Sequence, residues 1–161
     1  MGDSFAARLG ARAAHRTPPQ WLIPWITRAH IALYKLTNGR VGSTVAGKPA
    51  ILVRTIGARS GAFHTVALPY LSYNGDRLVV ASFGGGPKNP AWYHNLRAHP
   101  DIVVRDRGHV FWAHAEELEG DERAAAWDAI VADSPWYAEY QQRTTRTIPV
   151  IRLREIAPYV G

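Results

Sequence analysis

The sequence contains no cysteine among its 161 residues. Disulfide bonds, thiolate catalysis and cysteine-ligated zinc are therefore excluded, and an intracellular setting is the default expectation. Long apolar runs are also missing. No stretch reaches the roughly 18 uninterrupted apolar residues of a membrane span, and residues 1–14 lack the apolar core of a cleaved signal. We expect a cytoplasmic protein with one well-buried core, because 161 residues are too few for two ordinary domains.

Acidic residues are scarce at the N-terminal end. Residues 1–40 carry a net charge of +5, with Asp3 as their single acid, which leaves only +1 for residues 41–161. Within this arm, the segment PPQWLIPWITRAHIALYKL places apolar side chains at helical spacing beside Arg28 and Lys35. The apolar positions of this pattern are Trp21, Trp25, Ala29 and Ala32.

Two interpretations of this basic amphipathic arm stay open. Tryptophans beside arginines suit a helix that lies on an anionic membrane surface, which would place the protein peripherally on the inner face of the cell membrane. The alternative is a helix packed over the core with its charges solvated. Nucleic acid is not expected as a partner, because residues 41–161 are nearly neutral and show no stripe of interleaved basic and aromatic residues.

The rest of the chain is dominated by strand patterns. Six segments read as strands, and they are residues 50–56, 63–73, 77–83, 101–106, 109–118 and 147–156. Helical patterns occupy residues 121–133 and 135–143, and a short helix is expected to open with Asn89 as its N-cap and Pro90 at its first position. Because strands and helices do not alternate, the sequence predicts an α+β, mainly antiparallel barrel with helical insertions, residues 41–161, after the N-terminal helix.

Three consecutive glycines, residues 84–86, stand just before that short helix. A bare backbone exposes amide donors, and a helix N-terminus adds positive potential, so this loop is suited to an anion. Lys88 stands beside the loop, while Arg59 and Ser60 lie in the other glycine-bounded turn. No Gly-Lys-Ser/Thr follows the glycines and no βαβ context surrounds them, which excludes a P-loop and a dinucleotide fingerprint. A merely flexible hairpin loop is the alternative.

Three segments together resemble a known family. They are GARSGAFHTVALPYL, ASFGGGPKNPAWYHNLRAHPDIVV and YAEYQQRTTRTIPVIRL. Across residues 47–155 the chain is similar to the deazaflavin-dependent nitroreductases, also called F-420-dependent quinone reductases. The resemblance implies a split β-barrel of the FMN-binding type that holds coenzyme F-420, an 8-hydroxy-5-deazaflavin with a phosphate and an oligoglutamate tail. FMN is the alternative cofactor. The implied reaction is hydride transfer to a quinone-like acceptor, with nitro compounds as further acceptors.

The resemblance also implies site residues. Hydroxyl groups that protonate the acceptor or hold its oxyanion are expected on Tyr137, Tyr140 and Ser82. Contacts with the cofactor are expected from Ala58, Arg59, Ser60, His64, Thr65, Val66, Ala67, Leu68, Pro69, Val80, Ala81, Ser82, Phe83, Lys88, Ala91, Trp92, Tyr93, His94, Asn95 and Tyr137. Two positions depart from the family pattern, because Phe83 and His64 stand where basic residues are common.

Some of these residues also have a purely structural interpretation. Trp92 and Tyr93 would also serve as core aromatics of a short helix, and Tyr137 and Tyr140 would share one face of any helix. The histidines show no ligand spacing, so no metal site is expected. A non-catalytic deazaflavin- or FMN-binding module and a membrane-surface protein remain alternatives to the reductase. The pattern decides neither the physiological acceptor nor the oligomeric state.

Overall fold

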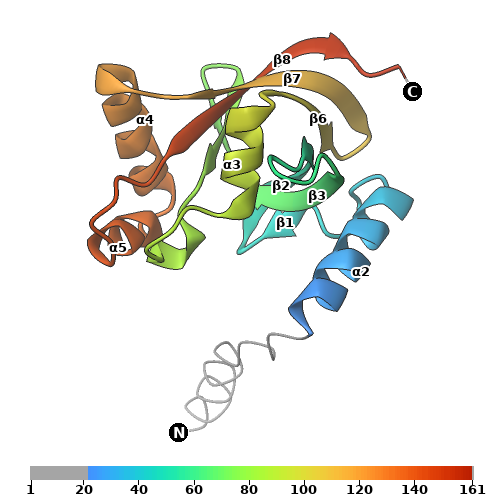
Figure 1. Ribbon diagram of the computed structural model, residues 1–161, viewed down its shortest axis with the longest axis horizontal. Coiled ribbons are helices and arrows are strands. Elements are labelled where there is room, and N and C mark those ends of the chain that lie inside the picture. Colours follow the sequence, from blue (N-terminus) through green and yellow to red (C-terminus); the bar gives the residue numbers. More distant parts are fainter. Residues whose placement is uncertain (1–21, 161) are drawn as a thin grey trace, which may run out of the picture.

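Eight antiparallel strands form a curled sheet in the computed structural model, which describes residues 22–160 (Figure 1). The strands are β1 (Thr44–Val45), β2 (Lys48–Ile56), β3 (Phe63–Pro69), β4 (Leu71–Tyr73), β5 (Asp76–Val80), β6 (Asp101–Asp106), β7 (His109–Glu117) and β8 (Val150–Pro158). Their order is β1-β2-β6-β7-β8-β5-β4, and β3 pairs with the other edge of β2. The prediction of a mainly antiparallel α+β barrel is confirmed.

The strand boundaries differ from the prediction most of all in one region. Residues 63–73 were expected as a single strand, but the chain changes partners at Tyr70, where the backbone amide bonds to the carbonyl of Pro49. Before this point β3 pairs with β2, and after it β4 pairs with β5. Together with the two-residue strand β1, this change of partner turns the six predicted strands into eight. The strand expected at residues 77–83 also ends earlier, at Val80, and the strand expected at 147–156 begins later, at Val150.

The barrel core follows from the alternation of side chains along the strands. Ile51 and Val53 of β2 and Phe111 and Ala113 of β7 are fully buried, whereas Trp112 between the last two points outward. Each such large aliphatic or aromatic side chain contributes about 1.5 to 3 kcal/mol by leaving water. These residues enclose the interior and fix which face of each strand is free to meet a ligand.

Four helices surround this sheet in the described residues: α2 (Ile23–Leu36), α3 (Ala91–Ala98), α4 (Gly120–Asp133) and α5 (Trp136–Gln142). Tyr93 and Leu96 pack α3 onto the barrel core. Ala126 and Ile130 of α4 join a second apolar cluster with Leu78. Figure 1 shows α4 and α5 on one side of the barrel and α2 on the other.

The C-terminal half of α2 is anchored to the barrel by Tyr34. Its side chain is fully buried, and its hydroxyl donates to the carbonyl of Ala50 at 3.0 Å and accepts from the amide of Arg107 at 2.7 Å. Gly39 follows with φ +73°, and a Cβ there would stand 2.6 Å from the Cα of Arg107. A packed helix therefore describes this half of α2. The arm boundary at residue 40 stays a prediction, and the part of the arm before Leu22, including Trp21, lies outside the described residues.

We expect Tyr34→Phe to lower the free energy of unfolding by about 1 to 3 kcal/mol, because the buried amide of Arg107 and carbonyl of Ala50 lose their partner while the packing volume is kept. Denaturant titration measures the change. Tyr73→Phe on the edge strand β4 is the matched control, with an expected change within about 0.5 kcal/mol. Equal changes in both variants would show that the Tyr34 hydroxyl does not anchor α2.

Candidate functional site

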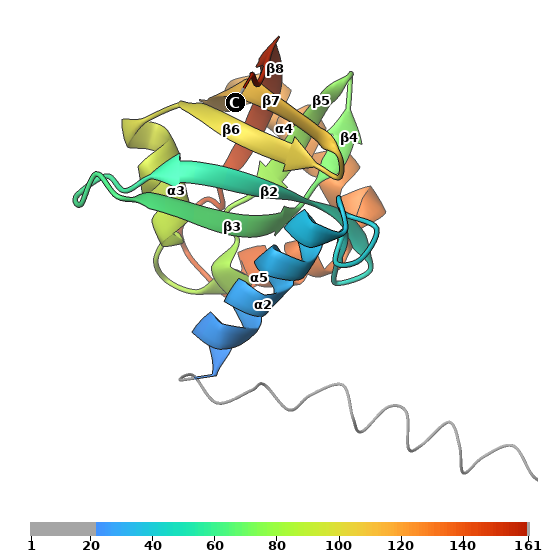
Figure 2. The same cartoon turned by 90° about the vertical axis from the view of Figure 1, so that its right-hand side faces the viewer.

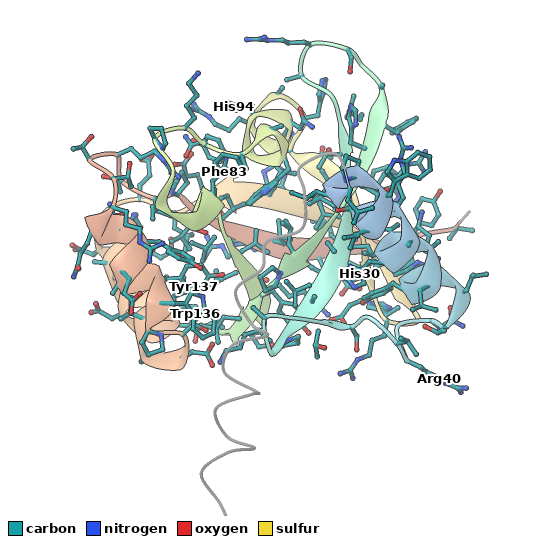
Figure 3. The ribbon with its side chains drawn as sticks, turned by 90° about the horizontal axis from the view of Figure 1, so that it is seen from below. His30, Arg40, Phe83, His94, Trp136 and Tyr137 are labelled. Atoms are coloured by element: carbon teal, nitrogen blue, oxygen red, sulfur yellow. The ribbon has the colours of Figure 1, made fainter. Side chains whose placement is uncertain are left out.

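An open cleft of about 1180 Å³ lies between the turn after β2, strand β3 and helix α3. It is lined by Gly57, Ala58, Arg59, Ser60, His64, Val66, Phe83, Asn89, Pro90, Ala91, Trp92, His94, Asn95, Arg97 and Ala98. Ten of these residues belong to the predicted cofactor site. Figure 3 looks toward this side of the barrel, with Phe83 before α3 and His94 on it. The structure thus brings the two predicted glycine-bounded segments to one place.

Hydrogen bonds to α3 hold the turn of residues 57–61. The side-chain oxygen of Asn95 accepts from the amide of Ala58 at 3.0 Å, and its nitrogen donates to the hydroxyl of Thr55 at 3.1 Å. Gly57 lets Ser60 approach the chain, because a Cβ at residue 57 would collide with the hydroxyl oxygen of Ser60. Asn95 and Ser60 therefore shape the rim of the cleft, and Arg59 is left exposed above it.

The charged side chains of the cleft are all basic. Arg59 and Arg97 line it with two histidines, and none of its lining residues is an aspartate or glutamate. Neither arginine forms an ion pair with a carboxylate within residues 22–160. The first turn of α3, at Ala91 and Trp92, forms part of the same wall and adds the positive end of the helix. This combination is suited to an anion.

Apolar groups form another part of the wall. Val66 and Trp92 are half-buried, and the ring of Phe83 is 65% exposed. Phe83 has φ +47°, an uncommon conformation for a residue with a large side chain. Where a cation is common in the family pattern, this chain therefore presents an aromatic surface. Such a surface suits the face of a flat ring rather than a negative charge.

The glycine triplet serves the packing of the chain. Gly84 and Gly85 have φ of +63° and +79°, and a Cβ on Gly85 would stand 2.6 Å from the carbonyl oxygen of Tyr140 in α5. Gly85 is buried. The structure therefore gives this glycine a reason other than the expected approach of a ligand: the loop needs it to pass α5.

Arg146 is the main residue that sequence reasoning missed. Its guanidinium donates to the carbonyls of Ala81, Ser82 and Gly86 at 3.2, 2.7 and 2.9 Å, and to the side-chain oxygen of Asn89 at 2.6 Å. Asn89 was expected to cap α3, but its side chain is bonded to Arg146, and the helix begins at Ala91 with no side-chain cap. No local pattern marks an arginine 57 residues away as this partner.

Arg97 also escaped the prediction, although a signal for it was present. Ala91, His94, Asn95 and Ala98 line the cleft at the spacing of one helix face, and Arg97 follows His94 by three residues. Residues three and four apart share a helix surface. Extending the predicted contacts along α3 at this period would have found it.

Several predicted contacts are turned away from the cleft. His64 and Val66 face it, so Thr65 and Ala67 lie on the other face of β3. Leu68, Ala81 and Tyr93 are buried in the core. The hydroxyl of Tyr93 donates to Glu117 at 2.8 Å, and burial raises the pKa of this tyrosine. Thr65 and Ala67 can meet a ligand in the cleft only through main-chain atoms, and the contacts of all five residues stay predictions.

None of the predicted acceptor residues Ser82, Tyr137 and Tyr140 lines the cleft. Tyr137 lines a narrow pocket between α5 and the barrel with Pro69 and Val80, and its ring lies 6.0 Å from that of Tyr140 at an edge-to-face angle of 85°. Burial, and then the neighbouring Tyr140, raise the pKa of Tyr137, so its phenol keeps its proton at neutral pH. Ser82 is half-buried and precedes Phe83, whereas Lys88 is exposed and lines neither space.

Comparison with known proteins identifies the family of this chain. Residues 25–155 match the sequence profile of the F420H(2)-dependent quinone reductases, where F420H(2) denotes reduced coenzyme F-420. The chain belongs to the F420H(2)-dependent quinone reductase family. It is 36% identical over 132 residues to an F420H(2)-dependent quinone reductase of Mycobacterium tuberculosis strain H37Rv, covering 80% of this chain and 89% of that protein. A second such protein of the same strain, a putative one, is 33% identical over 106 residues, 66% of this chain and 89% of its own.

Solved structures agree with this assignment. The structure of an F420-H2 dependent reductase is 44% identical, has a TM-score of 0.60 and covers 66% of this chain and 94% of its own. A domain-swapped dimer is 39% identical, has a TM-score of 0.63 and covers 82% of this chain and 98% of its own. The split-barrel fold, the family and its class of oxidoreductase are therefore confirmed, and F-420 is confirmed as the family's cofactor. Nitro compounds as acceptors stay a prediction.

Proposed function

We propose that this protein transfers hydride from reduced F-420 to a quinone, with the charged part of the cofactor in the basic cleft. The observation that carries the proposal is the wall of that cleft, which combines Arg59, Arg97 and the first turn of α3 and contains no carboxylate. A phosphate with an oligoglutamate tail requires cations and amide donors without competing acids. Val66, Phe83 and Trp92 supply the apolar surface that a flat ring requires.

The residues of the chain divide the work of this reaction. The bound cofactor supplies hydride from its reduced ring. The cleft orients it, and the hydroxyls of Ser82, Tyr137 and Tyr140 are proposed to hold the quinone oxygen and to deliver its proton. Because burial raises the pKa of Tyr137, this hydroxyl is a donor throughout the neutral range.

Changing Arg59 to glutamine is expected to weaken F-420 binding by about 1 to 3 kcal/mol, because one charge-assisted hydrogen bond to the anionic part is lost. Titration of the purified protein with F-420 measures this change. Added salt should reduce the difference in affinity between the variant and the unchanged protein. Arg154→Gln removes the same charge from an exposed position of β8 that does not line the cleft and should leave the affinity unchanged.

A titration curve of Arg59→Gln that matches both the unchanged protein and Arg154→Gln would remove Arg59 from the site. The same titration with FMN tests the alternative cofactor. A protein that binds reduced F-420 but passes hydride to none of the acceptors tested would instead be a non-catalytic binding module. Both functions require the same binding residues.

A finer proposal concerns the place of the reaction. Quinones of the menaquinone type reside in the bilayer, and α2 combines exposed apolar side chains with basic ones, which supports a peripheral position on the inner face of the cell membrane. No helix between residues 22 and 160 is long and apolar enough to cross a membrane. The exposed apolar side chains of α2 could instead contact a second copy of the chain, because one related structure is a domain-swapped dimer.

A further inference from the structure

Exposed apolar side chains concentrate on and just after α2. Six large ones, each at least 44% exposed, are Ile23, Trp25, Ile26, Leu33, Leu36 and Val41. Figure 2 shows α2 running beside β3, with its N-terminal end beyond the sheet. A concentration of exposed apolar side chains of this kind marks an interaction site more often than a solvated face. The charged side chains of residues 22–41 are all basic, which restricts what can cover this surface.

A groove of about 230 Å³ lies next to α2 on the sheet face that is turned away from the cofactor cleft. It is lined by Lys35, Leu52, Arg54, Thr65, Val103, Arg105, Val110 and Tyr159. Arg54 pairs in register with both Thr65 and Val103, and Leu52 pairs with Arg105, so these side chains share one face. His64 and Val66 point to the opposite face, into the cleft. The groove is therefore a separate site.

Three cations converge on this groove without a carboxylate. Lys35, Arg54 and Arg105 line it, no acid does, and none of the three forms an ion pair within the described part of the chain. The guanidinium of Arg54 lies 4.0 Å from the ring centre of Phe63, which keeps it over the sheet. Leu52, Val103 and Val110 supply an apolar part of the lining, and Thr65 and Tyr159 complete it. A basic groove with an apolar floor suits an amphiphilic anion.

We propose that this groove binds the phosphate headgroup of an anionic lipid while the apolar side chains of α2 enter the bilayer surface. Arg28 and Lys35 are seven residues apart and lie on one side of α2, so a basic row separates its apolar surface from Arg54 and Arg105. An anionic leaflet matches this order of charges. A second copy of the chain in a symmetric contact would instead set like charges against each other.

This proposal rests on the proposed function, because the reduction of a membrane quinone is the reason for the protein to bind a membrane. Figure 1 shows α2 and α5 on opposite sides of the barrel, and Figure 3 shows Trp136 and Tyr137 across the strands from α2. A protein held at the membrane surface by α2 would stay close to the leaflet in which quinones of the menaquinone type reside.

Co-sedimentation of the full chain with lipid vesicles tests the groove. Vesicles of phosphatidylcholine, with and without phosphatidylglycerol, are compared for the unchanged protein, for Arg54→Gln with Arg105→Gln, and for Arg97→Gln with Arg154→Gln as a control that removes the same charge elsewhere. We expect the groove pair to weaken binding to the anionic vesicles about tenfold or more, and the control pair less than about threefold. Vesicles of phosphatidylcholine alone should bind all three proteins weakly.

Three outcomes would overturn the proposal. Equal losses in both pairs would mean that only net charge matters. Inorganic phosphate that raises the melting temperature through Arg54 and Arg105, and releases the protein from vesicles, would indicate a soluble phosphate compound. The protein could also form a dimer in the absence of lipid. If the double variant Leu33→Ser with Leu36→Ser dissociates that dimer, a second copy of the chain covers α2.

F-420 titration of the groove pair separates this proposal from the cofactor cleft. Unchanged affinity with weakened vesicle binding is the expected result. A parallel loss of both would contradict a separate groove. Failure of the unchanged protein to bind F-420 would refute the proposed function and leave the vesicle result standing.

Discussion

Tyr137→Phe is expected to lower quinone turnover about 100-fold while F-420 binding changes little, because the substitution keeps the ring and removes only the hydroxyl that we propose as the donor to the quinone. The ring lines a pocket together with Pro69 and Val80, and the phenylalanine ring would keep the shape of that pocket. Single-turnover oxidation of the reduced cofactor by a soluble quinone measures the effect. Tyr140→Phe tests the second hydroxyl in the same way, and Tyr73→Phe serves as the control.

The pH dependence sharpens this test. Burial raises the pKa of Tyr137 above its ordinary value of 10.0, so the phenol form persists in neutral and mildly alkaline solution and disappears only above that value. The step that depends on Tyr137 should stay level below about pH 10 and decline beyond it. Equal losses of binding and turnover in Tyr137→Phe would indicate packing instead, and full activity in both tyrosine variants would remove the two hydroxyls from the chemistry.

Arg146→Met is expected to lower the free energy of unfolding by about 3 kcal/mol, because several charge-assisted hydrogen bonds are lost and partly buried carbonyls stay without a donor. The affinity for F-420 should fall too, since Arg146 ties Ser82, Gly86 and Asn89 into one loop beside the cleft. Denaturant titration and cofactor titration measure the two effects.

Arg143→Met is the matched control for Arg146. Arg143 is exposed and lies three residues earlier. It forms an exposed pair with Glu139 at 3.8 Å and lies over the ring of Tyr140, so its loss should cost less than about 1 kcal/mol. A destabilisation below about 1 kcal/mol for Arg146→Met would show that the loop keeps its conformation without this side chain.

Local patterns predicted most of the fold. The segments at residues 101–106 and 109–118 became β6 and β7 almost without change, because their alternation of apolar and polar residues matches a sheet with one buried face. The run of residues 63–73 was wrong as one strand. Its pattern continues through Tyr70, and only the pairing of β3 with β2 and of β4 with β5 divides it.

The site could be predicted only in part. The glycines and the basic turn directed attention to the cleft, since their effects on the backbone and on charge are local. The contact of Gly85 with Tyr140 and the bonds of Arg146 join segments about 55 to 65 residues apart, and no short-range pattern carries them. The resemblance predicted residues of β3 but did not indicate which face of the strand meets the cleft. The pairing of β3 with β2 in the structure shows which face it is.

The account rests most directly on one measurement, the oxidation of reduced F-420 bound to this protein on mixing with a menaquinone analogue. The proposed function predicts oxidation faster than the protein-free reaction by several orders of magnitude, with a rate that saturates with quinone and collapses in Tyr137→Phe. Tight binding of the reduced cofactor together with an oxidation rate equal to that of the protein-free solution would contradict it.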